Sequence, residues 1–132
     1  MSPDRSVPGT AEHWLARANS DLALARVPLP PGAFYEDLCF HAQQAAEKAI
    51  KAVYARHGWV FRNTHDLGEL LNGLVTLGLE IPHDVREAES LTVFASESRY
   101  PSLSEPVNAQ EYDRAPRLAQ VVVQWAKSQI DV

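Results

Sequence analysis

The sequence has one cysteine among 132 residues, and its five histidines show none of the spacings that usually hold a metal ion. Cys39 cannot form an internal disulfide, which favours a reducing compartment. No HxxxH pair and no CxxC pair occurs, so we expect no metal centre. The patterns GxGxxG, GxxxxGKS and GxxxxGKT are also absent, so neither a dinucleotide-binding turn nor a P-loop is predicted. We expect no bound cofactor.

Long apolar runs and an excess of positive charge are missing as well. No stretch approaches the ~20 apolar residues that a membrane span needs, and the N-terminal MSPDRSVPG has no apolar run of a signal peptide. The net charge is −5, which argues against broad, sequence-independent binding of nucleic acid because such binding needs a basic surface. A local basic site stays compatible with this composition. We expect a cytoplasmic protein without a membrane partner.

The sequence does contain strong helical periodicity, most clearly at Tyr35–His57. This segment has no glycine or proline, is rich in alanine, and repeats apolar residues at steps of three and four, which predicts a long helix. The repeating residues are Tyr35, Leu38, Cys39, Ala42, Ala46, Ala49, Ile50 and Val53. Ala45, Ala52 and Ala55 place small residues on other faces, where neighbouring helices can approach closely. We predict that this is the central helix.

Four further segments show the same period and carry start signals. Thr10 is the predicted N-cap of the first helix, Thr64 of the third, and Asn108 with Glu111 has the spacing of a capping box for the last. The fourth segment starts at Pro82. The apolar stripes are Trp14, Leu15, Ala18, Leu22 and Ala25; Leu67, Leu70, Leu71, Leu74 and Leu77; Val85, Ala88, Leu91, Phe94 and Ala95; and Ala115, Leu118, Ala119, Val122, Trp125 and Ile130.

Two details of these segments remain to be resolved by a structure. Arg17 and Asp21, four residues apart, are expected to pair on the outside of the first helix. Pro116 predicts either a kink in the last helix or a helix that begins near Asp113. No alternating strand pattern occurs, so we predict an all-α, up-and-down bundle of about five helices with Tyr35–His57 at its centre. It forms one domain of residues 10–132 after a flexible tail of residues 1–9.

A polar strip on the central helix is the first candidate site. Asp37, His41, Gln44 and Lys48 lie on the face opposite the apolar stripe. This strip could hold an anionic group, with Lys48 as the charge and His41 as a proton carrier. The simpler and more frequent alternative is a solvated helix face. Phe40 lies nearby off the stripe and suggests either a second helix packed on that side or a dimer surface.

Two further clusters have a functional and a structural interpretation. Arg62, His65 and Asp66 lie at the start of the third helix, where an anion is favoured. Asp66 already supplies a carboxylate to that helix end, however, so capping is the simpler account. Arg99 and Tyr100 could bind a phosphate or cap the end of the fourth helix, and the sequence favours neither interpretation.

Four segments in the same order resemble the HEPN family, the higher eukaryote and prokaryote nucleotide-binding domains. They are WLARANSDLALAR at 14–26, CFHAQQAAEKAIKA at 39–52, RNTHDL at 62–67 and ESRYP at 97–101, and the match extends over roughly residues 14–125. The resemblance implies a helical bundle that usually dimerises. It also implies a neighbouring minimal nucleotidyltransferase as partner, often in a toxin–antitoxin system. Several family members are metal-independent ribonucleases whose site is an Arg followed four to six residues later by His.

This chain departs from the ribonuclease pattern. Arg62 and His65 have only two residues between them, Arg56 and His57 are adjacent, and no histidine follows Arg99. The resemblance therefore favours a non-catalytic module that binds a nucleotide of the ATP class or a nucleotidyltransferase. The candidate binding residues are His41, Gln44, Lys48, Arg62, His65, Arg99 and Tyr100.

Two alternatives stay open. One is a ribonuclease with a different arrangement, in which His41 or His65 moves the proton and Arg62 or Arg99 holds the phosphate. RNA receives the least support of the possible ligands because the net charge is negative. The other is a dimeric interaction domain without a small ligand.

Overall fold

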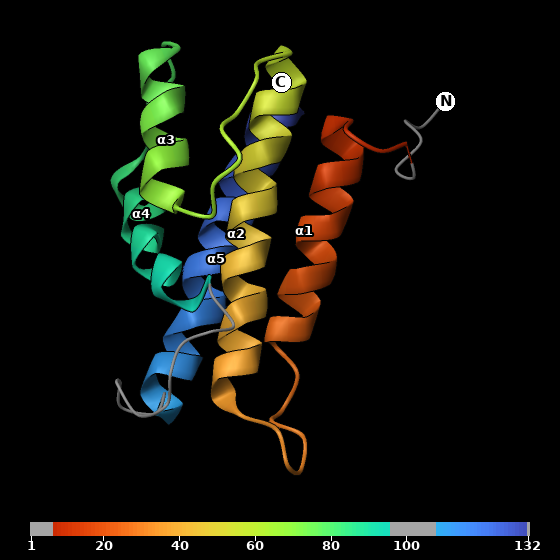
Figure 1. The fold of residues 1–132 in the computed structure, drawn as a ribbon, viewed down its shortest axis with the longest axis vertical. Helices are drawn as coiled ribbons and strands as arrows, with labels where there is room; N and C mark the ends of the chain where they lie inside the picture. Colours follow the sequence, from red (N-terminus) through yellow and green to blue (C-terminus); the bar gives the residue numbers. More distant parts are fainter. Residues whose placement is uncertain (1–6, 96–107, 132) are drawn as a thin grey trace.

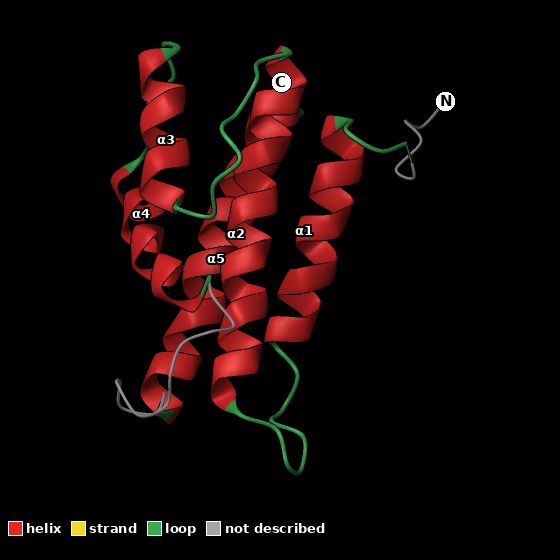
Figure 2. Ribbon diagram, in the orientation of Figure 1, coloured by secondary structure: helices red, strands yellow, loops and turns green. Residues whose placement is uncertain are grey.

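The computed structural model describes residues 7–95 and 108–131. In these two ranges the chain forms five α-helices and one 3₁₀ helix and has no strand (Figure 2). The elements are α1 (Ala11–Ala25), α2 (Tyr35–His57), α3 (Leu67–Thr76), α4 (His83–Glu87), η1 (Ala88–Phe94) and α5 (Ala109–Ile130). The all-α bundle that the periodicity predicts is therefore confirmed. Most of the predicted tail lies outside the described residues.

Helix α2 is the central element of the bundle. It packs mainly against α1 and α5, while η1 and α3 contact it from a further side (Figure 1). Ala45, Ala46, Ala49 and Ala52 are fully buried, because small side chains on several faces let neighbouring helices approach closely. Gly58 ends the helix in the left-handed conformation with φ 70°, which glycine adopts without a Cβ clash.

The connection after α2 reverses the direction of the chain before α3 begins. It runs back along α2, so that α3 points the same way as α2 (Figure 1). Helix α3 starts at Leu67, and Asp66 is its N-cap, accepting from the Glu69 N–H at 3.2 Å. The predicted cap Thr64 was wrong by two residues, because its hydroxyl instead accepts from the Asp66 N–H at 3.1 Å. The reversal places the connection beside the middle of α2.

The fourth segment is helical, but only its first part is an α-helix. Val85, Ala88, Leu91 and Phe94 are buried as expected. They follow one another at steps of three, which is the period of a 3₁₀ helix, and residues from Ala88 onward adopt that form. The predicted end of this segment lies outside the described residues.

Helix α5 begins at Ala109 and continues through Pro116. The Asn108 side chain accepts from the Glu111 N–H at 2.9 Å, which confirms the predicted cap. A start near Asp113 was therefore wrong. Pro116 has no N–H and cannot donate the helical hydrogen bond to the Tyr112 carbonyl. The Asn108 cap stabilises the helical turns that precede the proline.

Helix α1 starts where the sequence predicts it. The Thr10 hydroxyl accepts from the His13 N–H at 3.1 Å and caps the helix. Ala18, Leu22 and Ala25 form the buried stripe. None of the described helices is long and apolar enough to cross a membrane.

Candidate functional site

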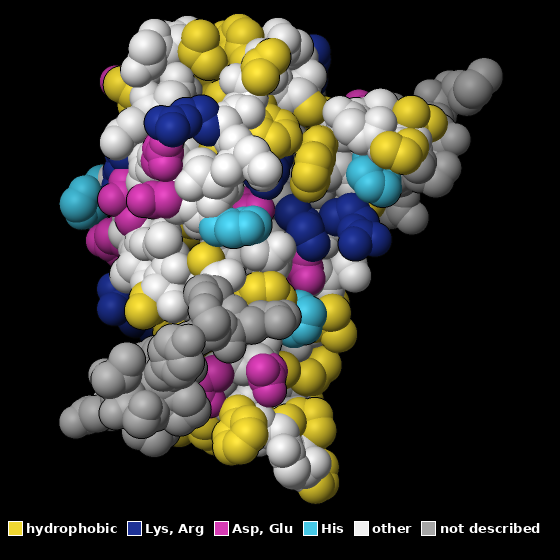
Figure 3. All heavy atoms as spheres, in the orientation of Figure 1, with side chains coloured by type: hydrophobic (Ala, Val, Ile, Leu, Met, Phe, Trp, Pro, Cys, Tyr) yellow, Lys and Arg dark blue, Asp and Glu magenta, His cyan; other side chains and the backbone are white. Residues whose placement is uncertain are grey.

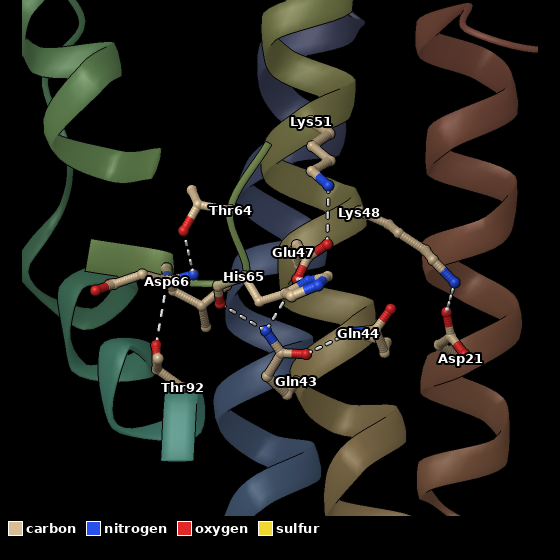
Figure 4. A network of polar contacts seen from close by, with 11 residues as sticks. Asp21, Gln43, Gln44, Glu47, Lys48, Lys51, Thr64, His65, Asp66 and Thr92 are labelled. Atoms are coloured by element: carbon tan, nitrogen blue, oxygen red, sulfur yellow. Dashed lines mark hydrogen bonds and ion pairs between the residues drawn. The ribbon is translucent and has the colours of Figure 1, made fainter. Parts of the chain in front are cut away.

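Helix α2 carries three buried polar side chains that sequence reasoning missed. Gln43, Glu47 and Lys51 follow one another at steps of four and are almost fully excluded from solvent. The Glu47 carboxylate accepts from Lys51 Nζ at 2.9 Å and from Gln43 Nε2 at 3.1 Å (Figure 4). Buried charges are tolerated only when they are paired. The group thus forms a satisfied polar network inside the bundle.

The returning connection adds His65 to this network. His65 Nδ1 lies 2.8 Å from Glu47 Oε1, and the His65 carbonyl accepts from Gln43 Nε2 at 3.0 Å (Figure 4). Helix α2 therefore holds this residue by its ring and by its backbone. The ring itself stays accessible, with 63% of the side chain exposed.

Two aromatic rings surround the buried ammonium group of Lys51. Its Nζ lies 5.5 Å from the centre of the Trp14 ring and 5.0 Å from that of Phe61. The faces of aromatic rings attract cations. The rings on α1 and on the connection, together with Glu47, account for a lysine inside the bundle.

A second buried carboxylate lies on α1. Asp21 Oδ1 is 3.0 Å from His41 Nδ1, and Asp21 Oδ2 accepts from Lys48 Nζ at 2.6 Å. The prediction that Asp21 lies on the outside was wrong, because its side chain turns toward α2 and is buried. Asp21 therefore joins α1 to the polar strip of α2.

The two carboxylates share one arrangement. Asp21 and Glu47 each hold a histidine Nδ1 on one oxygen and a lysine Nζ on the other. Gln44 lies between the two groups on α2, and its Nε2 donates to Gln43 Oε1 at 2.7 Å (Figure 4). We call the surface that His41, Gln44, Lys48 and His65 present, together with the buried carboxylates of Asp21 and Glu47 behind it, the polar face. Basic and histidine side chains gather over α1 and α2 on the side seen in Figure 3.

The network keeps the Glu47 carboxylate ionised. Burial alone would raise its pKa, but hydrogen bonds from Lys51, Gln43 and His65 and the charge of Lys51 outweigh burial. The pKa of Glu47 therefore lies below the ordinary value of 4.5. At neutral pH this carboxylate can only accept hydrogen bonds.

The structure brings together some of the predicted site residues but not others. His41, Gln44, Lys48 and His65 meet on the polar face. The strip is not a solvated helix face along its whole length, because the Lys48 side chain is only 18% exposed. Asp37 is exposed.

Arg62 stands apart from the polar face. Its side chain is 82% exposed, and its Nη1 lies 2.5 Å from Glu69 Oε1. Asp66 caps α3, so the structural interpretation of that cluster is confirmed for this residue. Arg99 and Tyr100 lie outside the described residues.

The residues that sequence reasoning missed left a weak signal. Glu47 and Lys51 are four apart in an alanine-rich stretch, and such a pair is usually an exposed one. Only the return of the connection to α2 shows that the pair is covered. Among the described residues, no group of three or more His, Cys, Asp and Glu side chains could hold a metal ion.

Comparisons with known proteins give a consistent result. The family model of the HEPN domain matches residues 11–129. The crystal structure of ST0689, an archaeal HEPN homologue, is 30% identical, with a TM-score of 0.73 over 92% of this chain and 98% of that chain. TT1696 from Thermus thermophilus is also 30% identical, with a TM-score of 0.75 over 90% of this chain and 97% of that one.

A curated relative supplies a further similarity. The Methanocaldococcus jannaschii protein named "Putative toxin MJ1304" is 36% identical over 70 residues. The alignment covers 53% of this chain and 45% of that protein. The chain therefore matches less than half the length of this relative.

Proposed function

Because this chain belongs to the HEPN domain family, we propose that it is the HEPN half of a toxin–antitoxin-type pair and binds its partner without catalysing a reaction. The proposed partner is a minimal nucleotidyltransferase, and the polar face is the proposed contact surface. The similarity to the Methanocaldococcus jannaschii protein named "Putative toxin MJ1304" supports a system of the toxin–antitoxin type.

One observation carries this proposal: contacts within the chain already position the side chains of the polar face. Both of its histidines and Lys48 are held by buried carboxylates. A preorganised surface loses little side-chain entropy on binding. Its basic groups are already engaged, and the nearest arginine of the connection is paired with Glu69. This arrangement suits recognition better than phosphoryl chemistry, which needs an arginine or lysine aimed at the phosphate.

A nucleotide of the ATP class is the second component of the proposal. It would be bound by the pair, with the partner supplying the nucleotidyltransferase domain. The chain itself would contribute the polar face and a homodimeric scaffold, which the family resemblance implies.

The test is co-expression with the product of the neighbouring reading frame, which the proposal expects to be a minimal nucleotidyltransferase. We expect the two proteins to co-purify, and calorimetry of the purified complex to detect ATP binding. A chain that purifies without such a partner and gives no heat with ATP would sink the proposal. Gel filtration of the chain alone reports whether it is a dimer.

A second candidate, a metal-independent ribonuclease, is favoured by one specific contact. A buried carboxylate orients the ring of His65 through Nδ1, and 63% of that side chain is exposed, which is the arrangement of a general base oriented by a carboxylate. This candidate predicts RNA cleavage in the presence of a chelator. His65→Ala should abolish it, while His83→Ala on α4, an exposed histidine far along the chain, should not. Cleavage that survives both His41→Ala and His65→Ala rules this candidate out.

A further inference from the structure

We propose that the polar face accepts hydrogen bonds from its ligand, and that it takes the guanidinium group of an arginine on a protein partner instead of a phosphate. This inference rests on the proposed function, because it names the chemistry that the partner brings. The histidine and lysine of the strip would by themselves suggest an anionic ligand, and we infer a cationic one.

The two histidine rings of the polar face carry a hydrogen on Nδ1. His41 and His65 each direct Nδ1 at a carboxylate oxygen, at 3.0 Å and 2.8 Å. An ionised carboxylate only accepts, so Nδ1 must carry the hydrogen. In a neutral ring Nε2 is then an acceptor.

Both lysines of the network are paired with a carboxylate of the chain itself. Lys48 Nζ lies 2.6 Å from Asp21, and Lys51 Nζ lies 2.9 Å from Glu47. Each lysine therefore neutralises the carboxylate that orients a histidine. The Lys51 side chain is only 8% exposed, so it offers nothing to a ligand. An anion would find fewer free donors here than the sequence of the strip implies.

The polar face keeps hydrogen-bond acceptors for a ligand. Gln44 Nε2 donates to Gln43 Oε1, which leaves Gln44 Oε1 as an acceptor one helical turn from His41. Beside the remaining N–H groups of Lys48 and Gln44, the polar face thus has three acceptors that no contact among the described residues uses: Nε2 of His41, Nε2 of His65 and Oε1 of Gln44. A guanidinium offers five N–H donors in a planar fork and matches several acceptors at once. The net charge of −5 also favours a cationic partner.

Arg17 is a cationic side chain and would favour an anionic ligand. It is exposed on α1 one turn before Asp21, and an anion bound at the polar face would use it. Substitution of Arg17 therefore distinguishes a face that binds an anion from a face that binds a cation. Asp37 is exposed one turn before His41 and favours a cation.

The first test needs no partner. The full chain is labelled with ¹⁵N and titrated with arginine amide or with inorganic phosphate, while its histidine resonances are followed. The titration is done at about pH 7.5, where a histidine is mostly neutral. We expect His41 and His65 to show the Nδ1–H form and to respond to arginine amide and not to phosphate, with His83 as the internal control. A response to phosphate, or to neither probe, overturns the proposal.

The second test uses the partner of the proposed function. His65→Arg places like charge against the partner's guanidinium, and we expect binding to weaken by about tenfold or more. Arg17→Ala should leave binding unchanged or strengthen it. The reverse pattern contradicts the inference. If the wild-type chain binds no partner, the proposed function fails, while the titration with the two probes still decides the polarity of the face.

Discussion

Glu47 is the residue on which most contacts of the polar face converge. Its two oxygens bind Gln43, Lys51 and His65, which come from α2 and from the connection before α3. A single buried side chain therefore fixes both the interior lysine and the exposed histidine. Loss of its charge should affect stability and binding together.

Replacement of this carboxylate tests that dependence. Glu47→Gln keeps the shape of the side chain but leaves the Lys51 ammonium without an ionic partner. Breaking a buried pair in this way costs about 3–5 kcal/mol, so we expect a large loss in the free energy of unfolding measured in urea. The double variant Glu47→Gln with Lys51→Met removes both charges and should recover most of the loss. Equal stability of the single and the double variants would contradict this account.

The pH dependence of stability gives a second prediction at this scale. The pKa of Glu47 lies below 4.5 in the folded chain. A carboxyl with a lowered folded pKa stabilises the fold above its unfolded pKa, and the contribution is lost as pH falls through the folded value. In urea unfolding from about pH 7 to about pH 3, wild type should therefore lose stability more steeply below about pH 4.5 than Glu47→Gln. Parallel curves for the two proteins would show that the network does not lower the pKa of Glu47.

At the scale of elements, the sequence predicts helices better than it predicts how they are connected. Periodicity and caps place α1, α2 and α5 closely, since these signals act within a few residues. The return of the connection along α2 depends on contacts between distant residues, such as Gln43 with the His65 carbonyl. No local pattern encodes such a contact. The 3₁₀ form of η1 was also not predicted, although the apolar residues of this segment follow one another at steps of three.

The packing of α3 on α2 depends on a glycine. The Tyr54 hydroxyl donates to the Leu70 carbonyl at 2.6 Å, and a Cβ added at Gly73 would lie 2.2 Å from that hydroxyl oxygen. Any larger residue at this position must displace the ring or the helix. Tyr54 is buried, so the ring has little room to move.

Gly73→Ala should therefore destabilise the protein by about 1–3 kcal/mol through overpacking. Tyr54→Phe alone should cost about 1 kcal/mol for the lost hydrogen bond. In the Tyr54→Phe background the nearest ring atom lies 3.5 Å from the added Cβ, so Gly73→Ala should cost much less there. Urea unfolding of the four proteins measures the coupling. If Gly73→Ala costs the same in both backgrounds, the hydroxyl is not what excludes a side chain.

At the scale of the whole molecule, the fold and part of the site follow from the sequence. His41, Gln44 and Lys48 were predicted from their spacing on one helix, His65 was predicted as part of a separate cluster, and the four meet on one face. The residues that orient them, Asp21 and Glu47, were not predicted, because an acidic residue on an amphipathic helix is usually exposed. The sequence therefore indicates which groups a ligand would meet, and the structure shows which charges hold them.

The central claim is that the polar face binds the partner. The most direct measurement is calorimetric titration of the separately purified nucleotidyltransferase into wild type, into the double variant His41→Ala with His65→Ala, and into His83→Ala. His83 is a suitable control because its side chain is 90% exposed on α4. Circular dichroism confirms that each variant is folded. We predict that the double variant binds at least about tenfold more weakly, while His83→Ala binds like wild type. Equal affinity of all three proteins would contradict the account.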